Sequence, residues 1–283
     1  MNDDAASSSR HLIEAALAED VGDGDRTTLW TVPADREVTA RVVAKAKGVI
    51  AGIEVARQVF AAVDGALRVS AAVADGDAVR PGSEVLRVEG SARSVLTAER
   101  VALNFLQHLS GVASLTRLYV DQVAGTGARI LDTRKTTPGM RLLEKAAVRA
   151  GGGTNHRVGL FDMVLIKENH IAAAGGIPAA VAAVRRSNSE GLRVEIETTS
   201  LSEVEEALGL GVDVILLDNM PLPLLREAVD LVRRARSRVQ TEASGGVTLA
   251  SVRGIAESGV DFVSVGALTH SAPALDLSLL VDG

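Results

Sequence analysis

Two cations follow an apolar run near the middle of the chain. Ile130–Leu131 is typical of a strand, and after two polar residues it leads into Arg134-Lys135 and then a Pro-Gly turn that opens a helix. Burying an unpaired cation costs several kcal/mol or more, so these side chains do not belong to a hydrophobic core. Their position at a strand end predicts a site that receives an anion.

The basic residues are concentrated around this pair. Residues 129–170 contain eight Lys/Arg and four Asp/Glu, a net charge of +4, whereas the whole chain carries −6, which leaves −10 for the remainder. A basic island in an acidic chain indicates a small polyanionic ligand. A nucleic-acid surface spreads its basic charge over a face and uses aromatic side chains for stacking, and this chain has only six aromatic residues.

The composition limits the class of protein. With 283 residues, 47% of them hydrophobic, the chain can form one large domain, or one large domain and one small one. The absence of cysteine excludes disulfides, thiolate metal sites and cysteine nucleophiles. Met1–Arg10 is polar and acidic, unlike a signal peptide, and no apolar run reaches membrane-spanning length. We therefore expect a cytoplasmic enzyme that binds neither membrane nor nucleic acid.

The first part of the chain has a mixed pattern and the second a regular one. Up to about residue 112, the sequence predicts helices over 8–20, 53–63 and 91–109, and strands over 38–46, 67–73 and 84–88. From about residue 128, helical segments separate six apolar strands at 128–132, 162–166, 193–197, 213–217, 239–243 and 261–265. This alternation predicts a parallel sheet, open or closed into a barrel, with fewer than eight strands. Ser202 and Glu205 fit a capping box for one of the helices.

Polar residues or glycines follow all six of these strands. In order they are Arg134-Lys135, Lys167, Glu197, Asp218-Asn219, Ser244-Gly245-Gly246 and Gly266. Active sites in parallel α/β proteins form at the carboxyl ends of the strands, so these residues should converge on one mouth. The pattern predicts an enzyme.

The cationic residues are suited to carboxylate or phosphate. Arg134, Lys135, His156, Arg157 and Lys167 supply many hydrogen-bond donors. Arginine pairs with such anions through two parallel bonds, and lysine acts as a point charge. The alternative is a set of surface ion pairs with Asp132, Glu144 and Glu168, which are common and weak.

The remaining strand ends suggest a sugar phosphate. Glu197 and Asp218 can hold sugar hydroxyls or Mg²⁺, although one of them could instead cap the next helix. Ser244–Gly246 and Gly266 can bring backbone N–H groups close to a phosphate, although glycines in loops are ordinary. A sugar phosphate and an aromatic dicarboxylic acid, bound side by side, would occupy the cationic pocket, the carboxylate pair and the glycine loops.

Several segments together resemble a known family. They are Glu19–Asp25, Thr27-Thr28, Glu99–Leu106, Asp132–Thr136, Gly151–Arg157, Leu165–His170, Leu216–Asn219, Ser244–Gly246 and Val265–His270, in order along residues 11–280. On these segments the chain resembles the quinolinate phosphoribosyltransferases, also called nicotinate-nucleotide pyrophosphorylases (carboxylating). The resemblance implies transfer of phosphoribose from phosphoribosyl pyrophosphate to quinolinate with Mg²⁺ and loss of CO₂. The products are nicotinate mononucleotide and pyrophosphate, on the de novo route to NAD.

The resemblance also implies roles for individual residues. The quinolinate carboxylates would be bound by Arg134, His156, Arg157 and Lys167, and Lys135 would lie near the diphosphate or the transition state. Ribose hydroxyls and Mg²⁺ would meet Glu197 and Asp218. The 5′-phosphate would be held by Ser244, Gly245, Gly246 and Gly266. Lys135, Glu197 and Asp218 are the expected catalytic residues. Thr199 departs from the family pattern, because many bacterial members have a second acid at that position.

The fold implied is α/β, with an N-terminal α/β sandwich domain and an incomplete, about six-stranded α/β barrel. We expect the sandwich in residues 1–112, joined by 271–283, and the barrel in 113–270. Family members form homodimers in which the arginine matching Arg100 completes the neighbouring site, and a higher oligomer is left open.

Three alternatives remain at this point. A paralogue associated with molybdenum transport shares the fold and several motifs, but the full set of arginines and His156 favours the quinolinate enzyme. A barrel lyase could form a Schiff base at Lys167. Residues 69–88 resemble a biotinyl or lipoyl carrier, but they lack the Met-Lys-Met turn that such a carrier needs.

Overall fold

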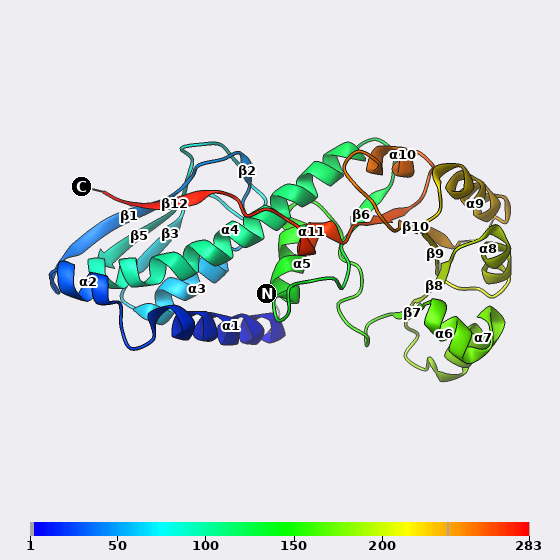
Figure 1. Ribbon diagram of the computed structural model, residues 1–283, viewed down its shortest axis with the longest axis horizontal. Coiled ribbons are helices and arrows are strands. Elements are labelled where there is room, and N and C mark those ends of the chain that lie inside the picture. Colours follow the sequence, from blue (N-terminus) through cyan, green and yellow to red (C-terminus); the bar gives the residue numbers. More distant parts are fainter. Residues whose placement is uncertain (1–2, 237, 283) are drawn as a thin grey trace. The chain divides into compact units, whose positions relative to one another are not determined.

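The chain forms two compact units. The computed structural model describes residues 3–236 and 238–282 (Figure 1). One unit comprises Met1–Arg117, Lys135–Gly152 and Ala267–Gly283, and the other comprises Leu118–Arg134 and Gly153–Gly266. The division predicted from the sequence, at 112/113 and 270/271, lies within five residues of two of these limits but does not separate out the segment 135–152.

The first unit is built on an antiparallel sheet in the order β12-β1-β5-β3. Its strands are β1 (Glu37–Ala44), β3 (Arg68–Ala71), β5 (Glu84–Ser91) and β12 (Leu277–Val281). Ala40 of β1 faces Val88 on one side and Val281 on the other, so the last strand of the chain pairs beside the first. The short strands β2 (Gly48–Val49) and β4 (Ala78–Val79) form a separate pair.

The helices of this unit were partly predicted. They are α1 (Asp3–Val21), α2 (Arg26–Thr31), α3 (Ile53–Val63), the first part of α4 (Ala92–Gln122), α5 (Arg141–Ala150) and α11 (Ala267–His270). The bounds of α3 are confirmed to the residue, and its buried side chains recur at helical spacing. Helix α4 continues past the predicted end at residue 109, because Gly111 allows close packing rather than stopping the helix. A Cβ there would collide with the backbone of Pro273.

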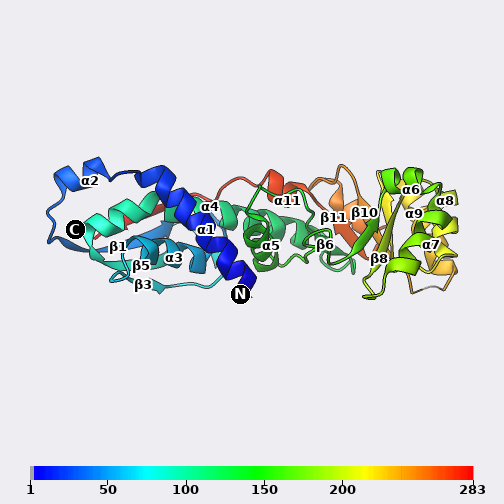
Figure 2. The same ribbon diagram turned by 90° about the horizontal axis from the view of Figure 1, so that it is seen from below.

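The second unit contains a six-stranded sheet in the order β6-β11-β10-β9-β8-β7, with parallel pairing throughout. The strands are β6 (Arg129–Leu131), β7 (Val164–Ile166), β8 (Val194–Thr198), β9 (Val214–Asp218), β10 (Gln240–Ser244) and β11 (Phe262–Ser264). All six predicted strands are confirmed within about two residues at each end. Figure 2 shows helices α6 (Glu168–Ala174), α7 (Ile177–Ser187), α8 (Leu201–Leu208) and α9 (Leu222–Arg234) on the outer side of these strands, and α10 (Val252–Ala256) precedes β11.

Strands β6 and β7 are the two edge strands of this sheet. In the sequence, residues 154–157 lie between them, after α5 and before β7. We call these residues the closing segment. Thr154 donates its N–H to the Ile130 carbonyl at 2.8 Å and accepts from Asp132 N at 3.2 Å, which attaches it to β6. At the other end, Arg157 Nη1 donates to the carbonyl of Met163, the residue before β7, at 3.2 Å. The closing segment thus connects the two edges by hydrogen bonds.

One predicted helix cap is wrong by two residues. Helix α8 begins at Leu201, and Ser200, not Ser202, is its N-cap, because the Ser200 hydroxyl accepts from Glu203 N at 3.3 Å. Glu203 in turn accepts from Thr199 N at 2.6 Å. The Ser-x-x-Glu pattern occurs in two overlapping registers here, and the strand end at Thr198 selects the earlier one.

No helix in the described part of the chain combines the length and the apolar character needed to cross a membrane.

Asp25 should stabilise the first unit as the N-cap of α2. Its carboxylate accepts from Thr28 N at 3.0 Å, and hydrogen bonds from Thr28 hold the pKa of Asp25 below its usual value. We expect Asp25→Ala to lower the free energy of unfolding by about 1 kcal/mol. Because the pKa is lowered on folding, this contribution should be present above pH about 4 and disappear as the pH falls further.

Urea unfolding at pH 7 and pH 3 would measure this difference. Asp23→Ala is the matched control, because Asp23 is exposed and its ion pair with Arg26 should contribute little. Equal unfolding free energies for the two variants at pH 7 would contradict the capping role.

Candidate active site

The carboxyl ends of β7 and β8 bring a predicted cation and a predicted carboxylate together. Lys167 directly follows β7, and Glu197 is the penultimate residue of β8. Lys167 Nζ lies 3.7 Å from Glu197 Oε2, with the lysine side chain 52% exposed and the glutamate only 14%. Because the lysine of this ion pair is exposed to solvent, an incoming charged ligand can rearrange the pair.

The carboxyl ends of β9 and β10 join the second carboxylate to the glycine loop. Asp218 ends β9, and Asn219 N donates to the Ser244 carbonyl at 2.9 Å. Asn219 also donates from its side-chain amide to Asp218 at 2.7 Å. Gly245 and Gly246 both have positive φ, at +98° and +58°, and a Cβ on Gly245 would collide with the Asn219 amide. Gly266 follows β11 by two residues and is half-buried.

Arg134 and Arg157, both predicted to bind an anion, belong to the second unit, and the charge of Arg134 affects the pKa of Arg157. Arg157 is only 9% exposed. Burial lowers its pKa, and the charge of Arg134 lowers it further, whereas Glu195 and Asp162 oppose the shift. Two guanidinium groups held near one another form a locally positive region that an anion would stabilise.

Two further predicted residues belong to the first unit. Arg100 is exposed on α4. Lys135 is also exposed, and its backbone carbonyl accepts from the Thr269 hydroxyl at 2.8 Å. In the same unit, Glu144 is fully buried, where it accepts from Thr137 N and pairs with His108 at 2.8 Å.

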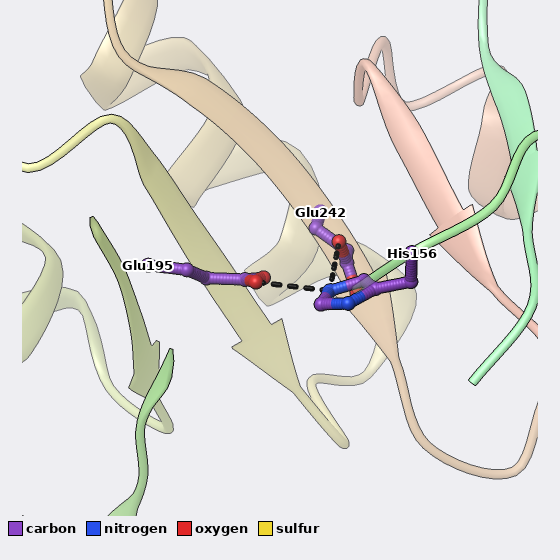
Figure 3. Close-up of side chains that lie close together, drawn as sticks. All are labelled: His156, Glu195 and Glu242. Atoms are coloured by element: carbon purple, nitrogen blue, oxygen red, sulfur yellow. Dashed lines mark hydrogen bonds and ion pairs between the residues drawn. The ribbon is translucent and has the colours of Figure 1, made fainter. Parts of the chain in front are cut away.

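His156 lies between two buried glutamates that the sequence did not single out (Figure 3). Its Nε2 is 2.9 Å from Glu195 Oε2 on β8 and 3.4 Å from Glu242 Oε2 on β10. Glu195 is 0% exposed and Glu242 2%, and Glu242 also accepts a hydrogen bond from the Ser264 hydroxyl. The other ring nitrogen, Nδ1, accepts from Arg157 N at 2.8 Å. Both nitrogens of this histidine therefore have protein partners.

The His156–Glu195 pair holds a proton near neutral pH. Burial favours the neutral imidazole, but hydrogen bonds and charges from Glu195 and Glu242 outweigh it and raise the pKa of His156 to about 9. Burial raises the pKa of Glu195 to about 7. The hydrogen bond with His156 opposes that shift and favours the ionised carboxylate of Glu195. Glu195 Oε1 is buried without a hydrogen-bond partner among the described residues.

The same three side chains are of the kinds that bind transition metals. One imidazole nitrogen and two carboxylate oxygens lie within 4.8 Å of one another. Arg157, however, is close enough to Glu195 for their charges to interact. A divalent ion at this position would repel that guanidinium, so the arrangement favours a proton.

The three residues form a layer beneath the strand ends. Glu195 precedes Glu197 by two positions on β8, and Glu242 precedes Ser244 by two on β10, so each pair points to the same side of the sheet about 7 Å apart. A cavity of about 140 Å³ is lined by this layer, by the closing segment including Arg157, and by residues at or just before the strand starts, among them Arg129, Met163, Arg193, Val214 and Phe262. We call His156, Glu195 and Glu242 the floor triad.

One sequence signal could have revealed the floor triad. Glu195 and Glu242 lie inside strands that otherwise read as buried, and a charged residue in such a strand needs a partner. Both positions lie inside their strands, so the pattern of polar residues at strand ends does not include them.

Comparison with known proteins agrees with this architecture. Residues 25–110 match the family model "Quinolinate phosphoribosyl transferase, N-terminal domain", and residues 112–280 match its C-terminal domain. A quinolinate phosphoribosyltransferase [decarboxylating] from Nicotiana tabacum is 47% identical over 96% of this chain and 81% of its own. A probable nicotinate-nucleotide pyrophosphorylase [carboxylating] from Synechocystis is 45% identical over 94% of this chain and 90% of its own.

Solved structures show the same fold over nearly the whole length. The nicotinate-nucleotide pyrophosphorylase from Francisella tularensis superposes with a TM-score of 0.93 at 39% identity, covering 98% of this chain and 96% of that one. The corresponding protein from Ehrlichia chaffeensis gives 0.90 at 40% identity, covering 96% and 98%. The site and fold define an α/β enzyme whose strand ends are suited to anions. The chain belongs to the quinolinate phosphoribosyltransferase family.

The glycine loop after β10 should tolerate one alanine better than the other. Both φ values are left-handed, which costs an alanine about 1 kcal/mol or more. Gly246→Ala meets open space and should cost about that amount, whereas Gly245→Ala also collides with Asn219 and should cost clearly more. Thermal unfolding of both variants would measure the difference, and equal melting temperatures would contradict the close packing at Gly245.

Proposed function

We propose that this protein transfers phosphoribose from phosphoribosyl pyrophosphate to quinolinate, with Mg²⁺, and releases CO₂. The observation that carries the proposal is the match to both family domains across residues 25–280, together with relatives of that name at 45–47% identity. The strand-end geometry supports it, because cations, a carboxylate pair and a glycine loop occur at neighbouring positions.

The cationic residues would bind the two carboxylates of quinolinate. In this proposal Arg134, His156, Arg157 and Lys167 contact the carboxylates, and Lys135 lies near the diphosphate or the transition state. The enzyme mainly holds two polyanions side by side and offsets their repulsion. Ser244, Gly245, Gly246 and Gly266 would hold the 5′-phosphate through backbone N–H groups.

The donor set at β8 and β9 fits Mg²⁺. Glu197 and Asp218 offer carboxylate oxygens on adjacent strands, and both are partly exposed, so water and substrate oxygens can complete the coordination. When bound, Mg²⁺ would neutralise charge on the diphosphate. Thr199, where many bacterial members have a second acid, has no carboxylate, and its hydroxyl donates to Glu203 at 3.0 Å. The pair Glu197 and Asp218 would therefore carry this function alone.

The same two carboxylates have a role in bond breaking. The C1′–O bond to pyrophosphate breaks as the ring nitrogen of quinolinate bonds to C1′, and positive charge develops on C1′. Glu197 and Asp218 can stabilise that charge electrostatically. The bond to the 2-carboxylate then breaks, its electron pair is stabilised by the quaternary ring nitrogen, and a proton takes the place of CO₂.

Schiff-base chemistry at Lys167 has less support. An amine nucleophile is usually activated in an apolar pocket or beside another cation, but Lys167 is half-exposed beside Glu197. Borohydride with carbonyl compounds should therefore leave Lys167 unmodified, and trapping at that residue would reopen this alternative.

A coupled assay tests the proposed reaction directly. Purified protein with Mg²⁺, phosphoribosyl pyrophosphate and quinolinate should form nicotinate mononucleotide, and nicotinate in place of quinolinate should not react. Chelation with EDTA should abolish turnover, and added Mg²⁺ should restore it. A folded protein that is inactive with quinolinate would move the assignment to the transport-associated paralogue. A cytoplasmic location stays a prediction, which fractionation of intact cells would test.

Arg134→Ala should chiefly weaken quinolinate binding. Loss of a charge-assisted hydrogen bond costs about 1.5–3 kcal/mol, so we expect the KM for quinolinate to rise roughly 10- to 100-fold. The KM for phosphoribosyl pyrophosphate should change little. Arg186→Ala is the control, since Arg186 is an exposed residue in the last turn of α7. An unchanged quinolinate KM in Arg134→Ala would remove this residue from the pocket.

We also propose a homodimer in which Arg100 completes the site of the neighbouring subunit. The exposure of Arg100 on α4 is compatible with such a contact. Arg100→Ala and Lys135→Ala should each be inactive alone. Mixed in equal amounts with free exchange, they should recover roughly a quarter of the wild-type activity, because half the dimers are mixed and each has one intact site.

Subunit exchange must be confirmed with two affinity tags. Exchange without recovery of activity would show that each site uses only its own subunit, and would contradict the shared site.

A further inference from the structure

Asn219 departs from ordinary strand geometry at the point where β9 ends. Its φ is +52°, in the left-handed region, which asparagine tolerates better than most residues that carry a side chain. In an extended chain, consecutive side chains point to opposite faces, so the Asn219 side chain would point away from Asp218. In the left-handed conformation its amide instead donates to Asp218 Oδ2 at 2.7 Å. A backbone conformation that is costly for most side chains is a signal of function where neighbouring contacts hold it.

The same residue also contacts the glycine loop on the neighbouring strand. Strands β9 and β10 lie side by side (Figure 1), and Asp218 is paired with Ser244 at the last position of their register. One residue further on, Asn219 N–H donates to the Ser244 carbonyl at 2.9 Å. The side-chain amide of Asn219 lies where a Cβ on residue 245 would be, so the close packing requires glycine there.

We propose that Asn219 is a positioning residue, which holds the Asp218 carboxylate and the Ser244–Gly246 loop in one fixed arrangement. The ribose and the 5′-phosphate of phosphoribosyl pyrophosphate can then be bound at the same time. This inference rests on the function proposed above, and it gives Asn219 a role that needs no contact with the substrate.

The chemistry of the ligand explains why these two parts of the site need a common support. The ribose hydroxyls and the 5′-phosphate belong to one molecule, so the groups that bind them must lie at a separation that matches its covalent structure. Asp218 is partly exposed, and among the described residues its carboxylate is found hydrogen-bonded only to the Asn219 amide. That bond fixes the orientation of the carboxylate and engages Oδ2, which leaves Oδ1 for a ligand.

Two substitutions at position 219 test the proposal. Asn219→Gly keeps a backbone that accepts a left-handed φ and removes the amide. Asn219→Asp keeps the shape but replaces the donor by a second carboxylate beside Asp218. We expect the KM for phosphoribosyl pyrophosphate to rise about tenfold or more in both, since a small displacement of binding groups has large effects. The KM for quinolinate should stay within about twofold, because its predicted contacts belong to other residues.

A binding measurement gives a readout that does not depend on turnover. Nicotinate mononucleotide, the expected product, carries both the ribose and the 5′-phosphate. In calorimetric titrations it should bind roughly tenfold more weakly to Asn219→Gly than to the wild type.

Asn188→Gly is the matched control for the loss of a side-chain amide. Asn188 also holds a loop, since its amide donates to the Leu192 carbonyl at 2.7 Å and accepts from Leu192 N at 2.9 Å. That loop precedes β8, so it lies at the other end of the strands from the candidate site. The substitution should lower the melting temperature and leave both KM values within about twofold of the wild type.

A double variant separates positioning from direct contact. Gly245→Ala puts a Cβ where the Asn219 amide lies, so it should displace the same amide that Asn219→Gly removes. Adding Asn219→Gly to Gly245→Ala should therefore raise the KM for phosphoribosyl pyrophosphate by less than about twofold further. It should also restore part of the melting temperature, because the collision is gone. Effects on KM that multiply would indicate that the amide touches the ligand itself, and would refute the positioning role.

The outcomes distinguish this inference from the proposed function. Inactivity of the wild-type protein with quinolinate would refute the proposed function. An active wild type, together with a normal KM for phosphoribosyl pyrophosphate in Asn219→Gly and Asn219→Asp, would refute the positioning role. Lower melting temperatures with unchanged KM values and unchanged affinity for nicotinate mononucleotide would show that Asn219 only stabilises the fold, which also overturns the proposal.

Discussion

The imidazole of His156 between two buried carboxylates is the interaction on which the barrel unit depends. The six-stranded sheet has two edges, β6 and β7, and backbone groups at an edge need partners if they are not to face solvent or the interior unpaired. The closing segment supplies partners to both sides. His156 ties that segment to β8 and β10, so the edges are joined through the interior as well as along the backbone.

This arrangement separates exposed from buried carboxylates within the same strands. Because side chains alternate with a period of two, β8 presents Glu195 to the interior and Glu197 at its end, and β10 presents Glu242 and then Ser244. The end positions are partly exposed and can exchange partners with a ligand. The inner positions are buried beside His156. Position along a strand therefore determines how far a carboxylate is open to a ligand.

The uneven charge of the chain has a structural reason at this site. A pocket for a dicarboxylate needs several cations close together, which repel one another in the absence of ligand. Arg157 shows this effect, since burial and Arg134 both lower its pKa. Glu195 and Asp162 oppose the shift and so compensate part of that repulsion. An acidic protein can thus carry a basic site.

The sequence by itself determined the six parallel strands, the polar residues at their ends and the family, because strand periodicity and short motifs are local properties. It also indicated that Lys167, Glu197 and Asp218 lie at the same edge of the sheet, since the carboxyl ends of parallel strands meet there. It did not give the order of the strands, the N-cap at Ser200 or the floor triad. Glu195, Glu242 and His156 are far apart in sequence, and each is ordinary alone. Only tertiary structure decided that they meet, because their contact depends on sheet order, register and the path of the closing segment.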